Sequence, residues 1–140
     1  MLPQPFVTVA KGQVEGLEVA LDLTKEWEAL DNTSMLITAG LIVRKAFAEE
    51  HPDALAAFLK EYQASTAYIN EHVEEGAALV EKYDIVKAAV AKQAIPACNI
   101  TYLDGEDMKT ALSGYLQILF EQNPQAVGGA MPGDDFYLVK

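Results

Sequence analysis

The feature that most constrains the fold of this chain is a mostly nonpolar run at positions 35–43. It contains aliphatic and β-branched side chains and no charged residue. A segment that is apolar on both faces is typical of a central β-strand covered on both sides. The run is too short to span a bilayer, which takes about 20 residues. It therefore predicts a buried strand, which requires neighbouring strands, and the chain offers few other candidates.

Residues 17–23 predict a second strand. Every odd-numbered position of this segment is leucine or valine, whereas Glu18 and Asp22 fall on the opposite face. Such alternation is typical of a strand with one buried face. Thr24 then suits the N-cap of a short helix over residues 25–30. Residues 6–10 fit either a strand or a first helical turn, and the sequence leaves that choice open.

Helices are predicted for most of the chain after position 44. We expect them over residues 44–50, 73–83 and 85–94, with one long helix starting at Pro52 and another after Asp104. Both long helices carry an apolar stripe at helical spacing. The stripes are Leu55, Phe58, Leu59, Tyr62, Thr66 and Ile69 in the first, and Met108, Ala111, Leu112, Tyr115 and Leu119 in the second.

Length and charge bound the class of protein. The 140 residues are 51% hydrophobic and fit one globular domain. The formal net charge of -11 argues against nucleic-acid binding, because phosphate contacts need clustered lysine and arginine. It argues equally against attachment to an anionic membrane surface. The first residues lack the basic and long apolar regions of a signal peptide. We expect no nucleic-acid partner and no direct membrane insertion.

The residue types that carry most enzyme chemistry are sparse or badly placed. His51 and His72 flank one predicted helix, and at about 1.5 Å per residue they lie roughly 30 Å apart, too far to share a metal ion. The single cysteine, Cys98, has no basic residue beside it to activate a thiolate. Carboxylate pairs stand mostly at helix starts, where the helix dipole favours negative charge. We therefore expect no catalytic residue, no metal ion and no other cofactor.

Several segments carry motifs that occur together, in this order, in one family. Residues 2–8 (LPQPFVT) resemble its LPEPF segment, residues 21–27 (LDLTKEW) its LDLTEEW segment, and residues 41–52 (LIVRKAFAEEHP) its VVRKEFAEEHP segment. Similarity continues at residues 70–83, which match a Glu-rich helix pair of that family, and at residues 94–100 and 127–129. The family is the extracytoplasmic solute-binding proteins of ABC transporters, of periplasmic binding protein type II. The branch it resembles is the one related to thiamine-pyrimidine, alkanesulfonate and nitrate binders.

The resemblance implies an α/β fold: the helix-rich C-terminal part of a bilobal periplasmic-binding-protein-like protein, with few strands. Residues 1–33 would form the end of lobe two. Residues 34–140 would form the return crossing and the C-terminal helices of lobe one. An unpaired strand edge invites pairing, so we expect the sheet to be completed by dimerisation and the chain to be a homo-oligomer.

The resemblance also implies a function. The chain would be the C-terminal fragment of the solute-binding component of an ABC-type importer, which captures a small molecule outside the cytoplasm without catalysis. In the full-length protein the partners would be that solute and the ABC permease, and we expect the chain alone to bind small molecules weakly. Gln4 stands where the family has an acidic residue, which would change the charge preference there. The implied ligand contacts are Gln4, Pro5, Phe6, Ser34, Met35 and Thr38.

Two other functions stay open. One is a stand-alone interaction protein, derived from the same fold, that associates with itself. The other is an enzyme similar to proteins of that fold family that build a pyrimidine precursor, which would need reactive histidines and metal ligands. The distance between His51 and His72 and the isolation of Cys98 weigh against the enzyme.

Overall fold

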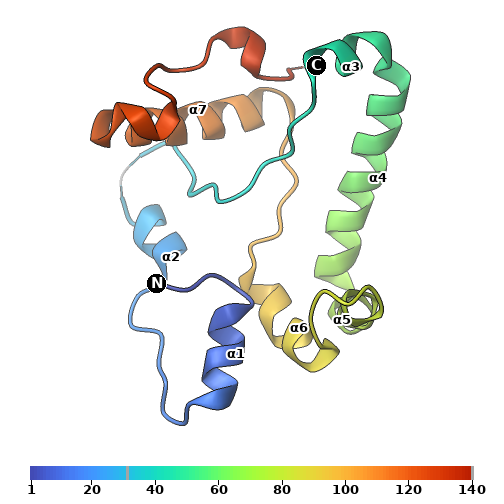
Figure 1. Cartoon of the computed structure of the whole chain (residues 1–140), viewed down its shortest axis with the longest axis vertical. Helices are drawn as coiled ribbons and strands as arrows, with labels where there is room; N and C mark the ends of the chain where they lie inside the picture. Colours follow the sequence, from blue (N-terminus) through green and yellow to red (C-terminus); the bar gives the residue numbers. More distant parts are fainter. Residues whose placement is uncertain (31, 140) are drawn as a thin grey trace. The chain divides into compact units, whose positions relative to one another are not determined.

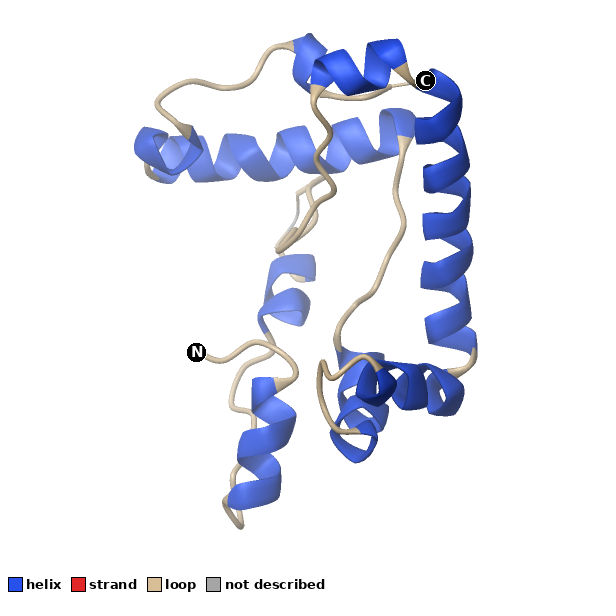
Figure 2. Cartoon of the chain, turned by 45° about the vertical axis from the view of Figure 1, so that its right-hand side comes forward, coloured by secondary structure: helices blue, strands red, loops and turns tan. Residues whose placement is uncertain are grey.

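The computed structural model describes residues 1–30 and 32–139, and every regular element in that part of the chain is helical (Figure 1, Figure 2). The expected α/β fold is therefore wrong, because the described residues form an all-α structure. The α-helices are α1 (Phe6–Gln13), α2 (Leu23–Glu28), α3 (Lys45–Glu50), α4 (Pro52–Glu71), α5 (Val73–Lys82), α6 (Ala88–Ala94) and α7 (Gly105–Gln122). The short 3-10 helices are η1 (Ile95–Ala97), η2 (Pro124–Val127) and η3 (Asp134–Phe136).

Neither predicted strand forms, for one physical reason. A β-strand exists only through hydrogen bonds to a neighbouring strand, and the described residues supply no such neighbour. Residues 34–44 form an irregular connection without helix, turn or bend, and residues 17–22 form another connection without helix or strand. The apolar side chains that were expected inside a sheet are exposed, among them Leu21 at 66% and Ile42 at 88%. The sequence already offered few candidate neighbours, and the part of the chain that the structure describes contains none.

The chain divides into two compact units. The first consists of Met1–Glu18 and Val43–Tyr102, which contain α1, α3, α4, α5, α6 and η1. The second consists of Val19–Ile42 and Leu103–Lys140, which contain α2, α7, η2 and η3. Each unit is built from segments that lie far apart in the sequence.

The core of the first unit is made of small side chains where α5 packs on α6. Ala77 and Ala91 are each 2% exposed and Ile95 is 5% exposed. Partly buried side chains complete the cluster: Ile69, Val73, Val80, Val86, Ala88 and Ile100. Alanines allow two helices to approach closely. They also bury little apolar area, and burial stabilises a fold by only about 25 cal/mol per Å².

Helix α4 is the longest element, and its apolar stripe is covered only in part. Pro52 and Asp53 begin the helix as expected, because proline fits the first turn and a carboxylate favours the positive end of the dipole. Leu55 near one end and Thr66 towards the other are buried. Phe58 and Tyr62 stack on each other with ring centroids 6.0 Å apart, yet they remain 50% and 39% exposed. The middle of the predicted stripe therefore faces solvent.

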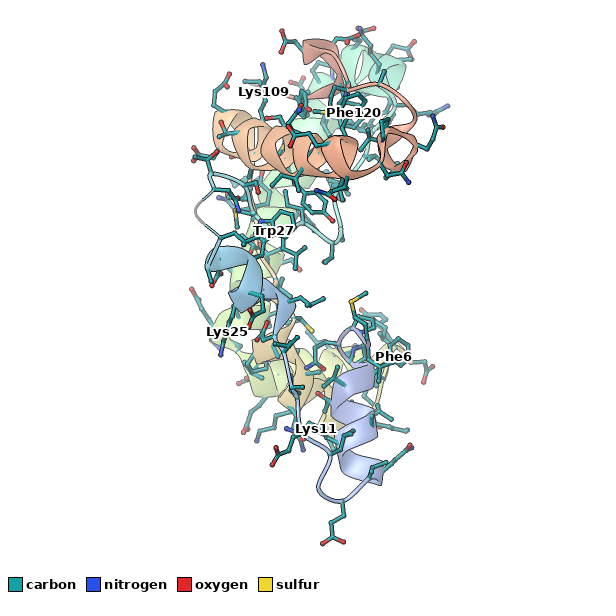
Figure 3. The ribbon with its side chains drawn as sticks, turned by 90° about the vertical axis from the view of Figure 1, so that its left-hand side faces the viewer. Phe6, Lys11, Lys25, Trp27, Lys109 and Phe120 are labelled. Atoms are coloured by element: carbon teal, nitrogen blue, oxygen red, sulfur yellow. The ribbon has the colours of Figure 1, made fainter. Side chains whose placement is uncertain are left out.

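The second unit is organised around α7. Trp27 of α2, labelled in Figure 3, contacts Tyr115 of α7 with ring centroids 5.5 Å apart. The C-terminal segment is anchored within this unit, because Tyr137 is only 9% exposed and Lys109 of α7 binds Asp134 at 2.8 Å. Helix α2 begins at Leu23, earlier than expected, since the capping side chain is Asp22 rather than the Thr24 that the sequence suggested. The Asp22 carboxylate accepts hydrogen bonds from two backbone N–H groups of the first turn.

The exposed area of the chain is large for its mass. It amounts to 10460 Å². Two compact bodies of the lengths of the two units, even if separate, would expose about 8,600 Å² together by the area–mass relation for folded monomers. The excess, roughly 1,900 Å², is more than the ~800 Å² that one partner buries in a standard protein interface. Large apolar side chains contribute to the exposed surface, among them Leu41, Ile42 and Phe6.

We expect Ile95→Ala to lower the free energy of unfolding by about 2–5 kcal/mol, because it removes buried methyl groups from the α5–α6 core and leaves a cavity. The matched control is Ile85→Ala, at a position that is 73% exposed, where the change should stay within about 0.5 kcal/mol. Urea unfolding followed by far-ultraviolet circular dichroism measures both. Equal losses in the two variants would contradict the assignment of the core.

Candidate functional site

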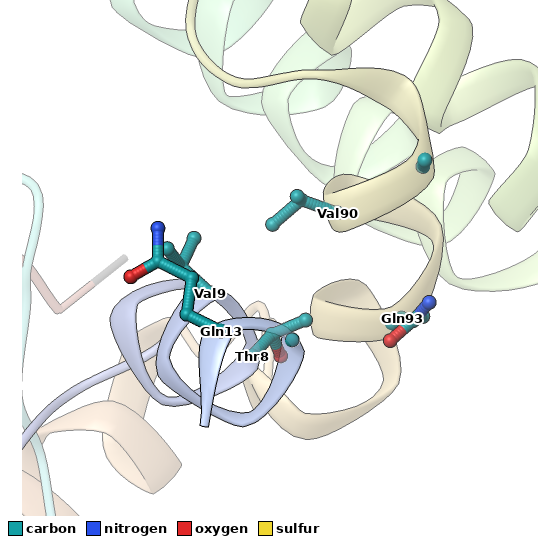
Figure 4. A pocket seen from close by; sticks show the side chains of 7 residues that line it. Thr8, Val9, Gln13, Val90 and Gln93 are labelled. Atoms are coloured by element: carbon teal, nitrogen blue, oxygen red, sulfur yellow. The ribbon is translucent and has the colours of Figure 1, made fainter. Parts of the chain in front are cut away.

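A pocket lies between α1 and α6, two helices of the same unit (Figure 4). Its volume is about 280 Å³. The lining residues are Thr8, Val9, Gly12 and Gln13 from α1, and Ala89, Val90 and Gln93 from α6. Small-molecule sites usually have volumes of about 300–1,000 Å³, so this one is at the lower limit for a small ligand.

The pocket is open because small residues stand where α1 faces α6. A Cβ atom added at Gly12 would meet no other atom within 4 Å, so this position borders free space. Val9 and Val90 point toward each other and form the apolar part of the lining (Figure 4). Larger side chains at the small positions would fill the space between the two helices.

The polar part of the lining is uncharged. Thr8 contributes a hydroxyl group, and Gln13 and Gln93 contribute amides. The Thr8 hydroxyl donates a hydrogen bond to Oε1 of Gln4 at 2.8 Å, which ties the segment before α1 to the pocket. With no ionisable side chain among its lining residues, the pocket offers apolar contact and neutral hydrogen bonding rather than acid–base chemistry.

Helix α6 is held in place by a carboxylate on α5. Glu81 accepts a hydrogen bond from the backbone N–H of Ala88 at 3.1 Å, which satisfies a free donor at the start of α6. The same carboxylate forms an ion pair with Lys87 at 3.0 Å. The hydrogen bond from Lys87, and then the one from Ala88, hold the pKa of Glu81 below its usual value. A second ion pair, between Lys92 and Glu74, also joins α6 to α5.

The residues expected to contact ligand fall into two groups in different units. Gln4, Pro5 and Phe6 precede or begin α1 in the first unit, where Gln4 adjoins the pocket through Thr8. Phe6 is 60% exposed at the start of α1 (Figure 3). The other three, namely Ser34, Met35 and Thr38, belong to the second unit.

Ser34 has a structural role within its own unit. Its hydroxyl accepts a hydrogen bond from Nε1 of Trp27 at 3.1 Å and donates one to Oδ1 of Asn32 at 2.6 Å. A Cβ atom added at Gly114 of α7 would lie 3.0 Å from the Cβ of Ser34, so α7 and this serine are in close contact. The serine thus positions Trp27 beside α7, whereas Met35 and Thr38 are exposed and form no part of the described pocket.

The residues considered for catalysis remain apart. His51 and His72 stand at the N-cap and C-cap of α4, which spans 20 residues. Among the residues that the structure describes, no group of three or more His, Cys, Asp or Glu side chains could hold a metal ion. Cys98 is exposed, and its partial desolvation raises the pKa of the thiol. A raised pKa keeps the sulfur protonated and poorly nucleophilic.

Sequence reasoning missed the pocket itself. Valine, glycine, alanine and glutamine are common on helix surfaces, so none of the lining residues signals a site by its type. A helix over residues 85–94 was predicted. Its contact with α1, which forms the pocket, was not predicted, because it depends on tertiary structure. The one usable signal was the motif at residues 2–8, which leads directly into α1.

We expect the Glu81 carboxylate to stabilise the α5–α6 pair at neutral pH and to lose this effect in acid. Its pKa is lower in the folded protein than the usual 4.5, so its contribution is present above that value and is lost as the pH falls through the lowered pKa. In urea unfolding, Glu81→Gln should be less stable than the natural sequence at about pH 7, and this difference should shrink as the pH falls below 4.5. Glu61→Gln, an exposed position on α4, is the control and should show no such difference.

In the part of the chain that the structure describes, no helix combines the length and the apolar character needed to cross a membrane. No protein-family model, curated protein or solved structure matches the chain. The functional proposal therefore depends on the residues of the chain and on the motif resemblance.

Proposed function

We propose that the chain is the C-terminal part of the solute-binding component of an ABC-type importer and takes part in capturing a small molecule without catalysis. The observation that carries this proposal is the pocket between α1 and α6. One of its walls begins within the segment, residues 2–8, that resembles the LPEPF motif of those proteins. The hydrogen bond between Gln4 and Thr8 connects that motif to the lining.

The side chains that line the pocket favour one of the ligand classes bound by the family branch that the chain resembles. Nitrate and alkanesulfonates are anions, and their recognition requires arginine, lysine or clustered N–H donors. The lining contains no cationic side chain, and the chain carries a net charge of -11, which repels anions. A neutral aminopyrimidine fits better, because its ring can contact Val9 and Val90 while its nitrogens exchange hydrogen bonds with the glutamine amides.

The affinity should be low. The pocket is at the lower limit of ligand-site volumes, so a bound ring would stay partly exposed to water. A dissociation constant of about 1 mM corresponds to roughly 4 kcal/mol of binding free energy, which a ligand of about ten atoms reaches at modest efficiency.

The test is a titration of the isotope-labelled chain with 4-amino-5-hydroxymethyl-2-methylpyrimidine, followed by nuclear magnetic resonance. We expect shifts of the amide signals of α1 and α6 that saturate at millimolar ligand. Nitrate and methanesulfonate should cause no saturable shift at the same sites. Gly12→Leu, which enlarges a residue that lines the pocket, should weaken binding at least about tenfold, so that the shifts saturate at a correspondingly higher ligand concentration.

The control variant is Ala64→Leu, which adds the same side chain at an exposed position of α4. It should bind the pyrimidine as the natural sequence does. A saturable response to nitrate or methanesulfonate, or pyrimidine binding that Gly12→Leu leaves unchanged, would contradict the proposal.

A further inference from the structure

The start of α6 is fixed by a side chain of α5. An α-helix leaves its first backbone N–H groups without a partner inside the helix. At α6 the N-cap residue is Lys87, whose side chain makes no capping hydrogen bond, because an ammonium group can only donate. Glu81 of α5 supplies the missing acceptor, since its Oε2 atom accepts a hydrogen bond from the N–H of Ala88 at 3.1 Å. The carboxylate therefore caps α6 from a neighbouring helix.

The other end of α6 is fixed by burial. Ala91 and Ala94 are each 2% exposed. The 3-10 helix η1 follows directly, and its Ile95 belongs to the core of this unit. The first three residues of α6, 88–90, are exposed or half-buried. The start of α6 therefore depends on the Glu81 carboxylate more than its end does.

The residues next to this cap line the pocket. Ala89 and Val90 directly follow Ala88, and both belong to the lining. Val90 points toward Val9 of α1 across the pocket (Figure 4). Because a helix rises about 1.5 Å per residue, Val90 lies only about 3 Å along the helix axis from the capped residue. A displacement of the start of α6 therefore changes the distance between Val90 and Val9.

We propose that Glu81 is a positioning residue of the pocket: its carboxylate holds the start of α6 at the distance from α1 that an aminopyrimidine ring requires, so that loss of the negative charge weakens ligand binding. Glu81 is not among the lining residues, so it acts through α6 rather than by contact with the ligand. The part of this inference that concerns the ligand rests on the proposed function. The part that concerns the placement of α6 by Glu81 does not.

Lys87 is the charged residue that faces Glu81. Its ammonium group pairs with the carboxylate at 3.0 Å, but the lysine is 82% exposed, and solvent screens such a pair. The hydrogen bond to the N–H of Ala88 is therefore the contact that fixes α6. Lys92 of α6 is paired with Glu74 instead. Two further elements pack on α5: η1, which has no charged side chain, and α4, which carries Asp53, Lys60, Glu61 and Glu71.

The first test compares two alanine substitutions on α5 in the titration with 4-amino-5-hydroxymethyl-2-methylpyrimidine at about pH 7. Glu81→Ala should weaken binding at least about threefold, because the start of α6 loses its cap. Glu74→Ala is the matched control, since Glu74 pairs with the side chain of Lys92 rather than with the backbone at the start of α6. It should bind the pyrimidine as the natural sequence does. Equal weakening by both variants would indicate a general loosening of the helix pair and overturn the proposal.

The second test needs no ligand. The amide signals of Thr8, Val9 and Gly12 on α1 are followed by nuclear magnetic resonance as the pH falls from about 7 to about 3. We expect these signals to shift below pH 4.5, because the hydrogen bonds from Lys87 and Ala88 lower the pKa of Glu81, and α6 moves when the carboxylate takes up its proton. The hydrogen bond from Lys92 lowers the pKa of Glu74 as well, so the response is assigned by substitution. It should be absent in Glu81→Ala and remain in Glu74→Ala.

Glu81→Gln keeps the test available if Glu81→Ala fails to fold. The glutamine retains one acceptor oxygen but cannot ionise, so the shift below pH 4.5 should be absent in this variant too. The same response of the α1 signals in the natural chain and in the Glu81 variants would overturn the proposal, whether or not a pyrimidine binds. Pyrimidine binding that Glu81→Ala leaves unchanged would overturn the proposal but not the proposed function. Absence of pyrimidine binding to the natural chain would overturn the proposed function and the part of this inference that concerns the ligand, while the α1 signals still test the placement of α6.

Discussion

A helix makes its backbone hydrogen bonds within itself, whereas an extended segment makes them only with a partner, and this difference governs the structure. Every regular element of the described chain is of the first kind. The two segments whose patterns require the second kind, residues 17–23 and 35–43, form no strand. The all-α fold thus includes regions that are strand-like in sequence but have no sheet to join.

The same constraint explains why the cores are small. Many large aliphatic side chains of residues 17–23 and 35–43 are exposed in irregular connections, and alanines such as Ala77, Ala91 and Ala111 are prominent among the buried residues. Polar contacts between exposed side chains add to the stability that this limited burial provides. The Glu81 carboxylate holds the start of α6, and Lys109 binds Asp134 to fix the C-terminal segment on α7. The pocket between α1 and α6 exists because small side chains meet there as well.

Local signals predicted the elements that depend on local interactions. Apolar periodicity indicated α4 and α7, and Pro52 marked the start of α4. Short helices were also expected at the places of α3 and α5, and the structure contains all four. The N-cap of α2 was misassigned by two residues, because both Asp22 and Thr24 can accept from a first-turn amide. The sequence pattern of a segment could not show whether a strand forms, since a strand also needs a partner strand from elsewhere in the chain. The pocket could not be predicted either, because its residues are neutral and common. Of the expected contacts, Gln4 alone adjoins it by a hydrogen bond that the structure identifies.

Amide hydrogen exchange tests most directly whether residues 35–43 form no strand in an otherwise helical chain. We expect the amides of residues 35–43 to exchange as fast as those of residues 17–22, and the amides within α5 and α6 to exchange much more slowly. Slow exchange at residues 35–43, comparable with that of α5 and α6, would contradict this account.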